Sequence, residues 1–436
     1  MRSLSDYSVN AEACAYCAKC HFGCPTYEAT QDEGYSARGK VQVAGAVARY
    51  GPLQAALLRD SPKLQEYLDF CLRCYHCMDV CPAHIATVPI FEALRFQSVT
   101  ECPPSAVLRF LMRKVLPNRR MTRFGSSAAA LVSMLLSFAS KRVRYSAPLK
   151  AALASLPRSQ RPASLAQRLT AHKAFKKCNL TPCNAHARNV SIRAILSSQS
   201  VAQPSMGTIG YFLDCLTDIY FPQAFTGVVR YLNQNGYRVA INPDGGCCGA
   251  SALNTGDEAA FMKMALAYAK TFADSPFQHI LFSNPTCYKT VKERYPEILG
   301  DASNKLPEPV LDVEIFAKLP PPNLHPAWKN ITVAWHNPCA LGMALGDKTT
   351  GASILRKWGF NVTHVVVPEE CCGYGGLFNL RYPQFASSLS EKKLRIWHDA
   401  GVDLVLSCSS GCITHLNETA ACKGIPIPTL HWGELF

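Results

Sequence analysis

The pentapeptide Gly-Cys-Cys-Gly-Ala spans residues 246–250, and the tripeptide Cys-Cys-Gly returns at residues 371–373. Around each pair, further cysteines and apolar runs recur at the same spacing, 124 residues apart. Short apolar runs alternate with longer helical runs in both copies, which predicts parallel sheets covered by helices. We therefore expect two copies of one α/β unit, over residues 206–325 and 326–436.

The expected strands end just before the repeated cysteines. They cover residues 208–213, 237–241 and 279–282 in the first copy, and 331–335, 362–367 and 404–407 in the second. Helices are expected over residues 220–235, 256–273, 348–359 and 383–400. Because the carboxyl ends of parallel strands meet at one edge of a sheet, the cysteines of each copy are expected to converge there.

Two denser cysteine runs lie within residues 1–100. They read Cys14-x2-Cys17-x2-Cys20-x3-Cys24-Pro25 and Cys71-x2-Cys74-x2-Cys77-x3-Cys81-Pro82. In such runs three closely spaced thiolates bind one cubane, and the cysteine before proline binds the other. The spacing predicts one [4Fe–4S] cluster on Cys14, Cys17, Cys20 and Cys81, and a second on Cys71, Cys74, Cys77 and Cys24. Zinc ribbons, the alternative, use two cysteine pairs per ion. This region is expected to be an all-α ferredoxin-like domain, so the fold class is α+β.

The repeated units offer unequal sets of metal ligands. The second copy contributes Cys339, Cys371, Cys372, Cys408 and Cys412, one thiolate more than a cubane or a tetrahedral zinc ion needs. The first copy contributes Cys215, Cys247, Cys248 and Cys287, and subtracting the repeat distance places Asn284 opposite Cys408. We predict an iron–sulfur cluster in the second copy, whereas a cluster, zinc or no metal stays open for the first. His336, three residues before Cys339, has two interpretations: it donates a hydrogen bond or a proton to a cluster thiolate, or, as we expect, it is a structural histidine with satisfied hydrogen bonds.

These motifs carry a family resemblance. The Cys-Cys-Gly pattern resembles the CCG domains of heterodisulfide reductases. The whole chain resembles the iron–sulfur subunit of bacterial glycolate oxidase, and is similar to those of anaerobic glycerol-3-phosphate dehydrogenase and lactate utilisation. The matching stretches are residues 14–27, 71–82, 246–250, 371–373 and 411–416. The resemblance implies that the five cysteines of the second copy hold a non-cubane [4Fe–4S] cluster.

The segment between the N-terminal cysteine runs and the repeated units is strongly basic. Residues 102–213 contain 18 Lys and Arg and no Asp or Glu, although the chain has 45 basic and 31 acidic residues in all. We expect residues 101–205 to form a basic helical linker, with helices over 105–116 and 128–139. Such a segment fits an anionic membrane surface or an acidic partner subunit, and these two alternatives stay open. It shows no nucleic-acid-binding module and few aromatic residues, so nucleic acid is not an expected partner.

Composition and motifs also narrow the location and the class of protein. The 21 cysteines come in clusters, which favours metal binding in a reducing compartment over a secreted disulfide scaffold. We see no secretory signal and no apolar run long enough to span a bilayer. We therefore expect a cytoplasmic protein, peripheral on the inner face of the cell membrane. No GxGxxG fingerprint follows a strand, so neither flavin nor nicotinamide is expected here, and we assign no catalytic residue.

The family resemblance implies a function. It implies an iron–sulfur electron-transfer subunit in a hetero-oligomer with an FAD-binding dehydrogenase that oxidises glycolate, lactate or glycerol-3-phosphate. Electrons would leave for a quinone or another membrane acceptor. Two alternatives remain: a heterodisulfide-reductase-like redox catalyst that acts on thiols and disulfides, and a non-enzymatic redox-sensing scaffold.

Overall fold

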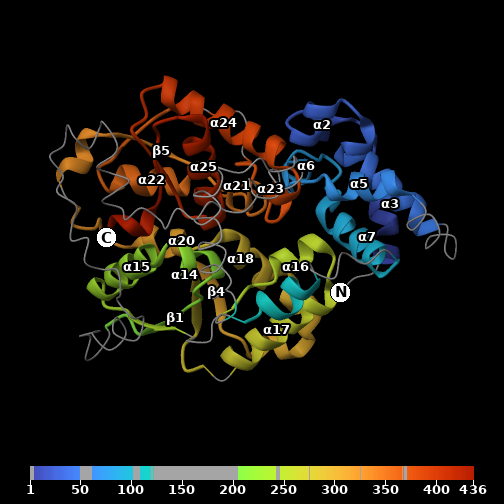
Figure 1. The fold of residues 1–436 in the computed structure, drawn as a ribbon. Coiled ribbons are helices and arrows are strands. Elements are labelled where there is room, and N and C mark those ends of the chain that lie inside the picture. Colours follow the sequence, from blue (N-terminus) through green and yellow to red (C-terminus); the bar gives the residue numbers. More distant parts are fainter. Residues whose placement is uncertain are drawn as a thin grey trace, which may run out of the picture.

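The structure is a computed structural model in which a helical N-terminal region lies beside two sheet-containing halves (Figure 1). In Figure 1 the blue N-terminal helices pack against both the green-to-yellow first half and the orange-to-red second half. The description covers residues 4–49, 61–101, 109–118, 121, 205–241, 246–273, 275–324, 326–365, 367 and 371–436.

The N-terminal region consists of short helices, and residues 4–49 and 61–101 contain no strand. Its elements are η1 (Leu4–Tyr7), α1 (Ser8–Glu12), η2 (Lys19–His21), α2 (Pro25–Thr30), η3 (Glu33–Tyr35), α3 (Ala37–Arg49), α5 (Pro62–Asp69), α6 (His76–Asp79) and α7 (Thr87–Glu101). Pro25 begins α2, where its missing N–H removes no helical hydrogen bond. Val41 and Ala44 of α3 pack against Ile90 and Leu94 of α7 in the core of this region.

The first half is a four-stranded parallel sheet with the strand order β2-β1-β3-β4. The strands are β1 (Thr208–Tyr211), β2 (Arg238–Ile241), β3 (His279–Phe282) and β4 (Glu308–Leu311). The helices are α14 (Cys215–Tyr220), α15 (Pro222–Gln234), α16 (Ala250–Thr255), α17 (Glu258–Phe272), α18 (Pro285–Lys289), η6 (Thr290–Arg294), α19 (Tyr295–Leu299), η7 (Gly300–Lys305) and α20 (Asp312–Lys318).

The second half repeats this topology, with the parallel order β6-β5-β7-β8. Its strands are β5 (Thr332–Trp335), β6 (Asn361–Val362), β7 (Leu404–Ser407) and β8 (Thr429–His431). Its helices are η8 (Pro326–Asn330), α21 (Cys339–Gly342), α22 (Thr350–Lys357), α23 (Phe378–Arg381), α24 (Pro383–Asp399), α25 (Ser410–Lys423) and η9 (Trp432–Leu435). The predicted fold class, an all-α N-terminal domain followed by two parallel α/β units, is confirmed. Two details differ: β4 and β8 were not predicted, and the strand expected over 362–367 is the short β6.

The two halves pack against each other in a reciprocal way. Helix α15 contacts η9 while its counterpart α22 contacts α20, and α14 contacts α25 while α21 contacts α18. Such exchanged contacts indicate an approximate two-fold relation, as in a symmetric dimer. Hydrogen bonds cross this boundary between the hydroxyls of Thr217 and Ser410 (2.5 Å) and from Trp432 Nε1 to Asp312 Oδ2 (2.9 Å). The boundary therefore holds the cysteine-bearing ends of α14 and α25 together.

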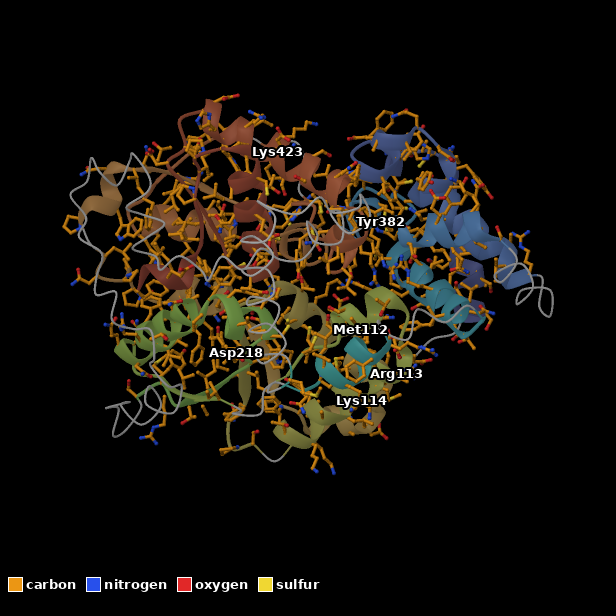
Figure 2. All side chains as sticks on the ribbon, viewed as in Figure 1. Met112, Arg113, Lys114, Asp218, Tyr382 and Lys423 are labelled. Atoms are coloured by element: carbon orange, nitrogen blue, oxygen red, sulfur yellow. The ribbon has the colours of Figure 1, made fainter. Side chains whose placement is uncertain are left out.

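Part of the basic linker packs on the first half rather than projecting from it. Residues Leu111–Val115 form the π-helical turn η4, from which Met112 enters the core of the first half. Arg113 Nε donates to both carboxylate oxygens of Asp257 (2.9 and 3.1 Å), beside α17 (Figure 2). The helix expected over 128–139 lies outside the described residues. No helix within the described residues is both long enough and apolar enough to cross a bilayer.

Candidate metal centres

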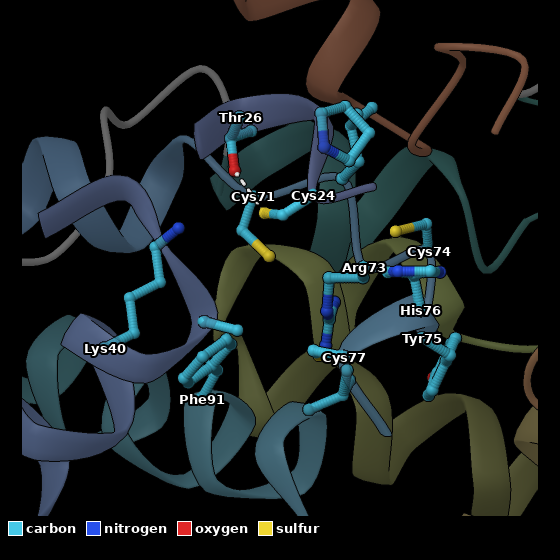
Figure 3. Close-up of a pocket in the computed structure, with 14 residues that line it drawn as sticks. Cys24, Thr26, Lys40, Cys71, Arg73, Cys74, Tyr75, His76, Cys77 and Phe91 are labelled. Carbon is cyan, nitrogen blue, oxygen red and sulfur yellow. Dashed lines mark hydrogen bonds between the residues drawn. The ribbon is translucent and has the colours of Figure 1, made fainter. Parts of the chain in front are cut away.

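One pocket in the N-terminal region is lined by all four cysteines predicted to hold the second cluster. Cys71, Cys74 and Cys77 come from the loop that precedes and enters α6, and Cys24 comes from the other run, at the start of α2 (Figure 3). The Cys24 thiol lies 3.3 Å from the Thr26 hydroxyl, and Phe91 belongs to the apolar wall. The structure thus brings together three thiols of one run and the proline-flanked thiol of the other.

The backbone of both cysteine runs is strained at corresponding places. The residue two places after the first cysteine has a positive φ in each run, at Tyr16 (54°) and Arg73 (54°). The residue after the second cysteine repeats this, at Ala18 (60°) and Tyr75 (65°). Each such residue costs about 1–2 kcal/mol, and strain of this kind persists where surrounding bonds over-determine it. Loops shaped in this way fit thiolates that wrap around a bound inorganic cluster.

Electrostatics within this pocket favour a bound cation. Burial, followed by the charges of Cys339, Cys24 and Cys77, raises the pKa of Cys74 well above its usual value. Burial and the neighbouring thiols Cys71 and Cys24 likewise raise the pKa of Cys77. Buried thiolates that repel one another are stabilised when iron supplies compensating charge, since a bound metal inverts the local pKa balance. The donor set therefore fits a [4Fe–4S] cluster.

The cysteines predicted for the first cluster lie nearer the surface. Cys14, Cys20 and Cys81 pack against the N-terminal core, whereas Cys17 is exposed. The Ile85 N–H donates to Cys81 Sγ (3.4 Å), and burial raises the pKa of Cys20 to about 11. A cluster at this position would lie within reach of an external redox partner.

Each sheet-containing half gathers four cysteines in the same order. In the first half, contacts between thiols link Cys215 to Cys247, Cys247 to Cys248 and Cys248 to Cys287. In the second half they link Cys339 to Cys371, Cys371 to Cys372 and Cys372 to Cys412. Two separate groups of thiols, each from three strand ends, are therefore present where the repeat predicts them, and all but the half-buried Cys215 and Cys339 are buried.

The Cys-Cys-Gly turns have the same backbone geometry in both halves. The glycine N–H donates to the sulfur of the first cysteine over 3.4 Å, from Gly249 to Cys247 and from Gly373 to Cys371. Both glycines have a positive φ, +83° and +86°, which residues with a side chain rarely adopt. An N–H···S bond stabilises an anionic sulfur, so this turn is suited to a thiolate that binds metal.

Cys408 lies apart from the other four thiols of its half. It follows β7 directly and is fully buried, and the charged groups that raise its pKa after burial are Asp312 and Asp347. Strand β3 ends at Phe282 and β7 at Ser407, so the structural counterpart of Cys408 is Ser283. The expectation that Asn284 occupies this position is wrong, because Asn284 caps α18 by accepting from the Thr286 N–H. A ligand role for Cys408 stays a prediction.

His336, rather than Cys408, lies beside the thiols of Cys372 and Cys412. A ring nitrogen of His336 and the sulfurs of Cys372 and Cys412 lie within 4.8 Å of one another, all buried. Burial and the charge of Lys393 lower the pKa of His336, which leaves the imidazole neutral. Its Nε2 has no hydrogen-bond partner among the described residues, so the expected satisfied structural histidine is wrong for this atom.

The thiol groups follow one another through the molecule. Cys74 and Cys371 share one apolar cluster with Leu72 and Phe378, so the second group of the N-terminal region adjoins the thiols of the second half. Between the two halves lies Tyr374, whose pKa is raised by burial and then by the charges of Cys215 and Cys412. The order is therefore first run, second run, second half, Tyr374 and first half.

Buried ionic and aromatic contacts hold the N-terminal region in this position. Glu92 lies between Arg73 (2.5 Å), within the second cysteine run, and Arg294 (2.8 Å) of the first half. All three side chains are at least nine-tenths buried. Toward the second half, the ring of Phe70 packs against the rings of Phe378, Tyr382 and Phe385. The distances between ring centroids are 4.6–5.4 Å.

Comparison with protein families agrees with this arrangement. The family model described as a 4Fe-4S dicluster domain matches residues 10–85. The model of the cysteine-rich domain, CCG, matches twice, at residues 209–292 and 333–417. The chain carries one 4Fe-4S dicluster domain and two CCG domains. The dicluster domain supports iron–sulfur clusters at the N-terminus, and the CCG domains correspond to the two sheet-containing halves.

Individual relatives extend this similarity over nearly the whole chain. The glycolate oxidase iron-sulfur subunit of Escherichia coli (strain K12) is 24% identical over 97% of this chain and 92% of its own length. Lactate utilization protein A of Halalkalibacterium halodurans is 24% identical over 52% of this chain and 95% of its own. Lactate utilization protein A 1 of Bacillus anthracis is 24% identical over 52% of this chain and 96% of its own length. The predicted resemblance to glycolate oxidase iron–sulfur subunits is confirmed, and it supports a role in electron transfer.

Proposed function

We propose that this chain is the iron–sulfur electron-transfer subunit of a flavin-linked dehydrogenase for a small 2-hydroxy acid such as glycolate or lactate. The observation that carries the proposal is the continuous order of thiol groups from the exposed Cys17 to the buried pair Cys371 and Cys372. An ordered series of one-electron sites is what a carrier between two distant partners requires.

The eight cysteines of the dicluster domain would hold two [4Fe–4S] clusters, each of which exchanges single electrons at a potential set by its surroundings. Cys14, Cys17, Cys20 and Cys81 would bind one, and Cys71, Cys74, Cys77 and Cys24 the other. In the second CCG domain, Cys339, Cys371, Cys372 and Cys412 would bind a further iron–sulfur centre, with Cys408 as the fifth predicted ligand.

Residues of this chain would control the relay in two ways. The half-buried Cys74 packs against the buried Leu72 and Phe378, and this apolar contact would limit the access of water between the dicluster domain and the second CCG domain. The N–H of Gly373 stabilises negative charge on Cys371, which favours the reduced state of a centre bound there.

The partner and the acceptor belong to other chains in this proposal. An FAD-binding dehydrogenase subunit would oxidise the hydroxy acid and transfer electrons near Cys17, so the assembly would be a hetero-oligomer. Electrons would leave from the CCG domains to a quinone or another acceptor. The basic linker, residues 101–205, would dock on that partner or on the inner face of the cell membrane.

The test uses the full chain purified without oxygen, alone and together with an FAD-binding dehydrogenase for glycolate or lactate. We expect glycolate or lactate to bleach the iron–sulfur absorbance only when the flavoprotein is present. Cys17→Ser should slow this reduction, and Cys422→Ser, which removes an exposed thiol outside the thiol groups, should leave it unchanged. Oxidation of either acid by the isolated chain would contradict the proposal. Reoxidation that depends on a disulfide would instead favour the thiol–disulfide catalyst.

A further inference from the structure

We propose that His336 is a metal ligand and that its imidazole binds the same metal atom as Cys372 and Cys412. The second CCG domain would then hold a mixed imidazole–thiolate centre, whereas the first would be thiolate only. This inference rests on the proposed metal centre of the second CCG domain, and it adds the identity of a donor that no cysteine pattern contains.

The spacing of the three donors fits a single metal atom. His336 follows β5, Cys372 lies in the loop before α23, and Cys412 lies in the first turn of α25, yet the three ligand atoms are within 4.8 Å of one another. Metal–sulfur bonds of about 2.3 Å and metal–nitrogen bonds of about 2.0–2.1 Å allow donors on one atom to be up to about 4.6 Å apart, so donors within 4.8 Å of one another need little or no movement to share one metal atom. Ligands on different irons of a cubane would lie farther apart. Three elements distant in sequence thus present their donors at chelating distance.

The environment of the imidazole points to a missing partner. His336 is 1% exposed, Cys372 2% and Cys412 6%, so water has little access. A buried polar atom without a hydrogen-bond partner destabilises the folded state, and Nε2 of His336 is such an atom within the described part of the chain. The ring of Trp397 orients the imidazole in an edge-to-face contact (6.1 Å) but supplies no hydrogen-bond acceptor. A metal bond would satisfy the ring and the two thiolates together.

The first CCG domain provides an internal comparison. The backbone N–H of His336 donates to the backbone carbonyl of Leu406 (2.8 Å). At the same position of the other sheet, the backbone N–H of Phe212 donates to the carbonyl of Leu281 (2.9 Å). Phe212 is therefore the structural counterpart of His336, and its ring stacks on Phe282 in the core (4.9 Å between centroids). The fold tolerates an apolar ring at this position, so folding alone does not require the histidine of the second half.

Imidazole together with thiolates selects borderline metals. Zinc takes mixed cysteine and histidine sets, and iron–sulfur centres with histidine in place of cysteine have raised reduction potentials. The metal is therefore either a zinc ion or one iron of the cluster proposed here. The metal content distinguishes zinc from iron, and so does the measurement that detects the nitrogen, which is pulsed EPR for iron and X-ray absorption for zinc.

The decisive experiment detects nitrogen bonded to the metal in the full-length chain. Protein containing ¹⁴N- or ¹⁵N-histidine is purified without oxygen, and its iron and zinc are counted. Pulsed EPR of the reduced protein then reports nitrogen coupling to iron, and X-ray absorption at the zinc edge reports nitrogen bound to zinc. We expect a histidine nitrogen at one of the two. A CCG centre with sulfur ligands only, or no metal beyond the dicluster domain, would overturn the inference.

Two substitutions and a control assign that nitrogen. His336→Cys should keep the metal and abolish the nitrogen signal, while His336→Gln should lower the metal occupancy of this centre. His431→Gln removes another fully buried histidine, whose ring hydrogen-bonds to the backbone of Gly433 and Cys408, and it should leave the signal unchanged. Unaltered dicluster signals show that each variant is folded. A nitrogen signal that survives both His336 changes would refute the inference, whereas a nitrogen-ligated centre that passes no electrons would refute only the proposed function.

Discussion

The two CCG domains share a sheet order, a Cys-Cys-Gly turn and a chain of four thiols, yet they differ in what surrounds those thiols. The second domain places His336 beside Cys372 and Cys412, where the first has the apolar Phe212. The second also adjoins Cys74 of the dicluster domain, whereas the first is reached through Tyr374. The difference teaches that duplication preserved the cysteine framework while the neighbouring positions diverged to give two unlike sites.

The largest difference is expected when the first cysteine of each turn is replaced. Cys371→Ser should remove the centre next to Cys74 and stop electrons from leaving the dicluster domain. Cys247→Ser should leave that first step intact, because the first CCG domain lies beyond Tyr374. The loss of metal affinity should exceed the roughly 10–100-fold seen when groups that only support a ligand are changed. Iron counts measure the loss of metal in each variant, and reoxidation rates of the reduced protein measure electron transfer out of the dicluster domain. Equal rates in the two variants would contradict the order of the relay.

The contacts of the dicluster domain with the two CCG domains should also differ in strength. Glu92→Gln leaves the buried Arg73 without its countercharge and leaves Arg294 paired with Glu297 alone, and losing one partner of a buried ionic group costs about 3–5 kcal/mol. Phe70→Leu, on the side of the second CCG domain, keeps an apolar group of similar size and should cost less than about 1.5 kcal/mol. Denaturant unfolding of the cluster-loaded protein compares them. A Glu92 variant as stable as the Phe70 variant would show that the ionic group does not hold the interface.

The glycines of the two turns should respond unequally to alanine. Both have a positive φ, which costs alanine about 1–2 kcal/mol. At Gly373 the new methyl group would also meet the backbone carbonyl of Ala386, while at Gly249 it would meet the ring of Phe261, a side chain rather than the backbone. Gly373→Ala is therefore expected to destabilise its domain more than Gly249→Ala does. Thermal unfolding followed at the iron–sulfur absorbance measures both. A larger destabilisation by Gly249→Ala would mean that the backbone around residue 373 shifts to accommodate the methyl group.

The smallest effect concerns the carbonyl of the second cysteine in each turn. The Ser390 hydroxyl donates to Cys372 O (2.5 Å), and the Tyr295 hydroxyl donates to Cys248 O (3.1 Å). Ser390→Ala and Tyr295→Phe should each cost about 1 kcal/mol. Because Cys371 of the second turn packs in one apolar cluster with Cys74, Ser390→Ala should alter the rate of electron transfer out of the dicluster domain more than Tyr295→Phe does. A larger change in this rate in the Tyr295 variant would place the first CCG domain earlier in the relay.

Local patterns predicted most of the fold but missed particular elements. Strands β1, β3 and β7 were found because each is a short apolar run beside a cysteine. β4 carries Pro309 at a sheet edge, and β8 is only three residues long, so neither shows a strand-like period. The match of Cys408 to Asn284 failed because the segment from the Cys-Cys-Gly turn to the end of β7 is one residue longer than the segment from the first turn to the end of β3. Subtracting a constant distance cannot detect such a shift, whereas the ends of the two strands reveal it.

The sequence by itself determined the cysteine runs, the repeat and the α/β class, because these depend on spacing along the chain and on the periods of strands and helices. Only the tertiary structure decided that Cys74 adjoins Cys371, that Tyr374 separates the two thiol groups, and that His336 faces Cys372 and Cys412. These are contacts between residues from about 40 to 300 positions apart in the numbering. No local pattern encodes such contacts, since they arise when separate helices and sheets bury their apolar faces against one another.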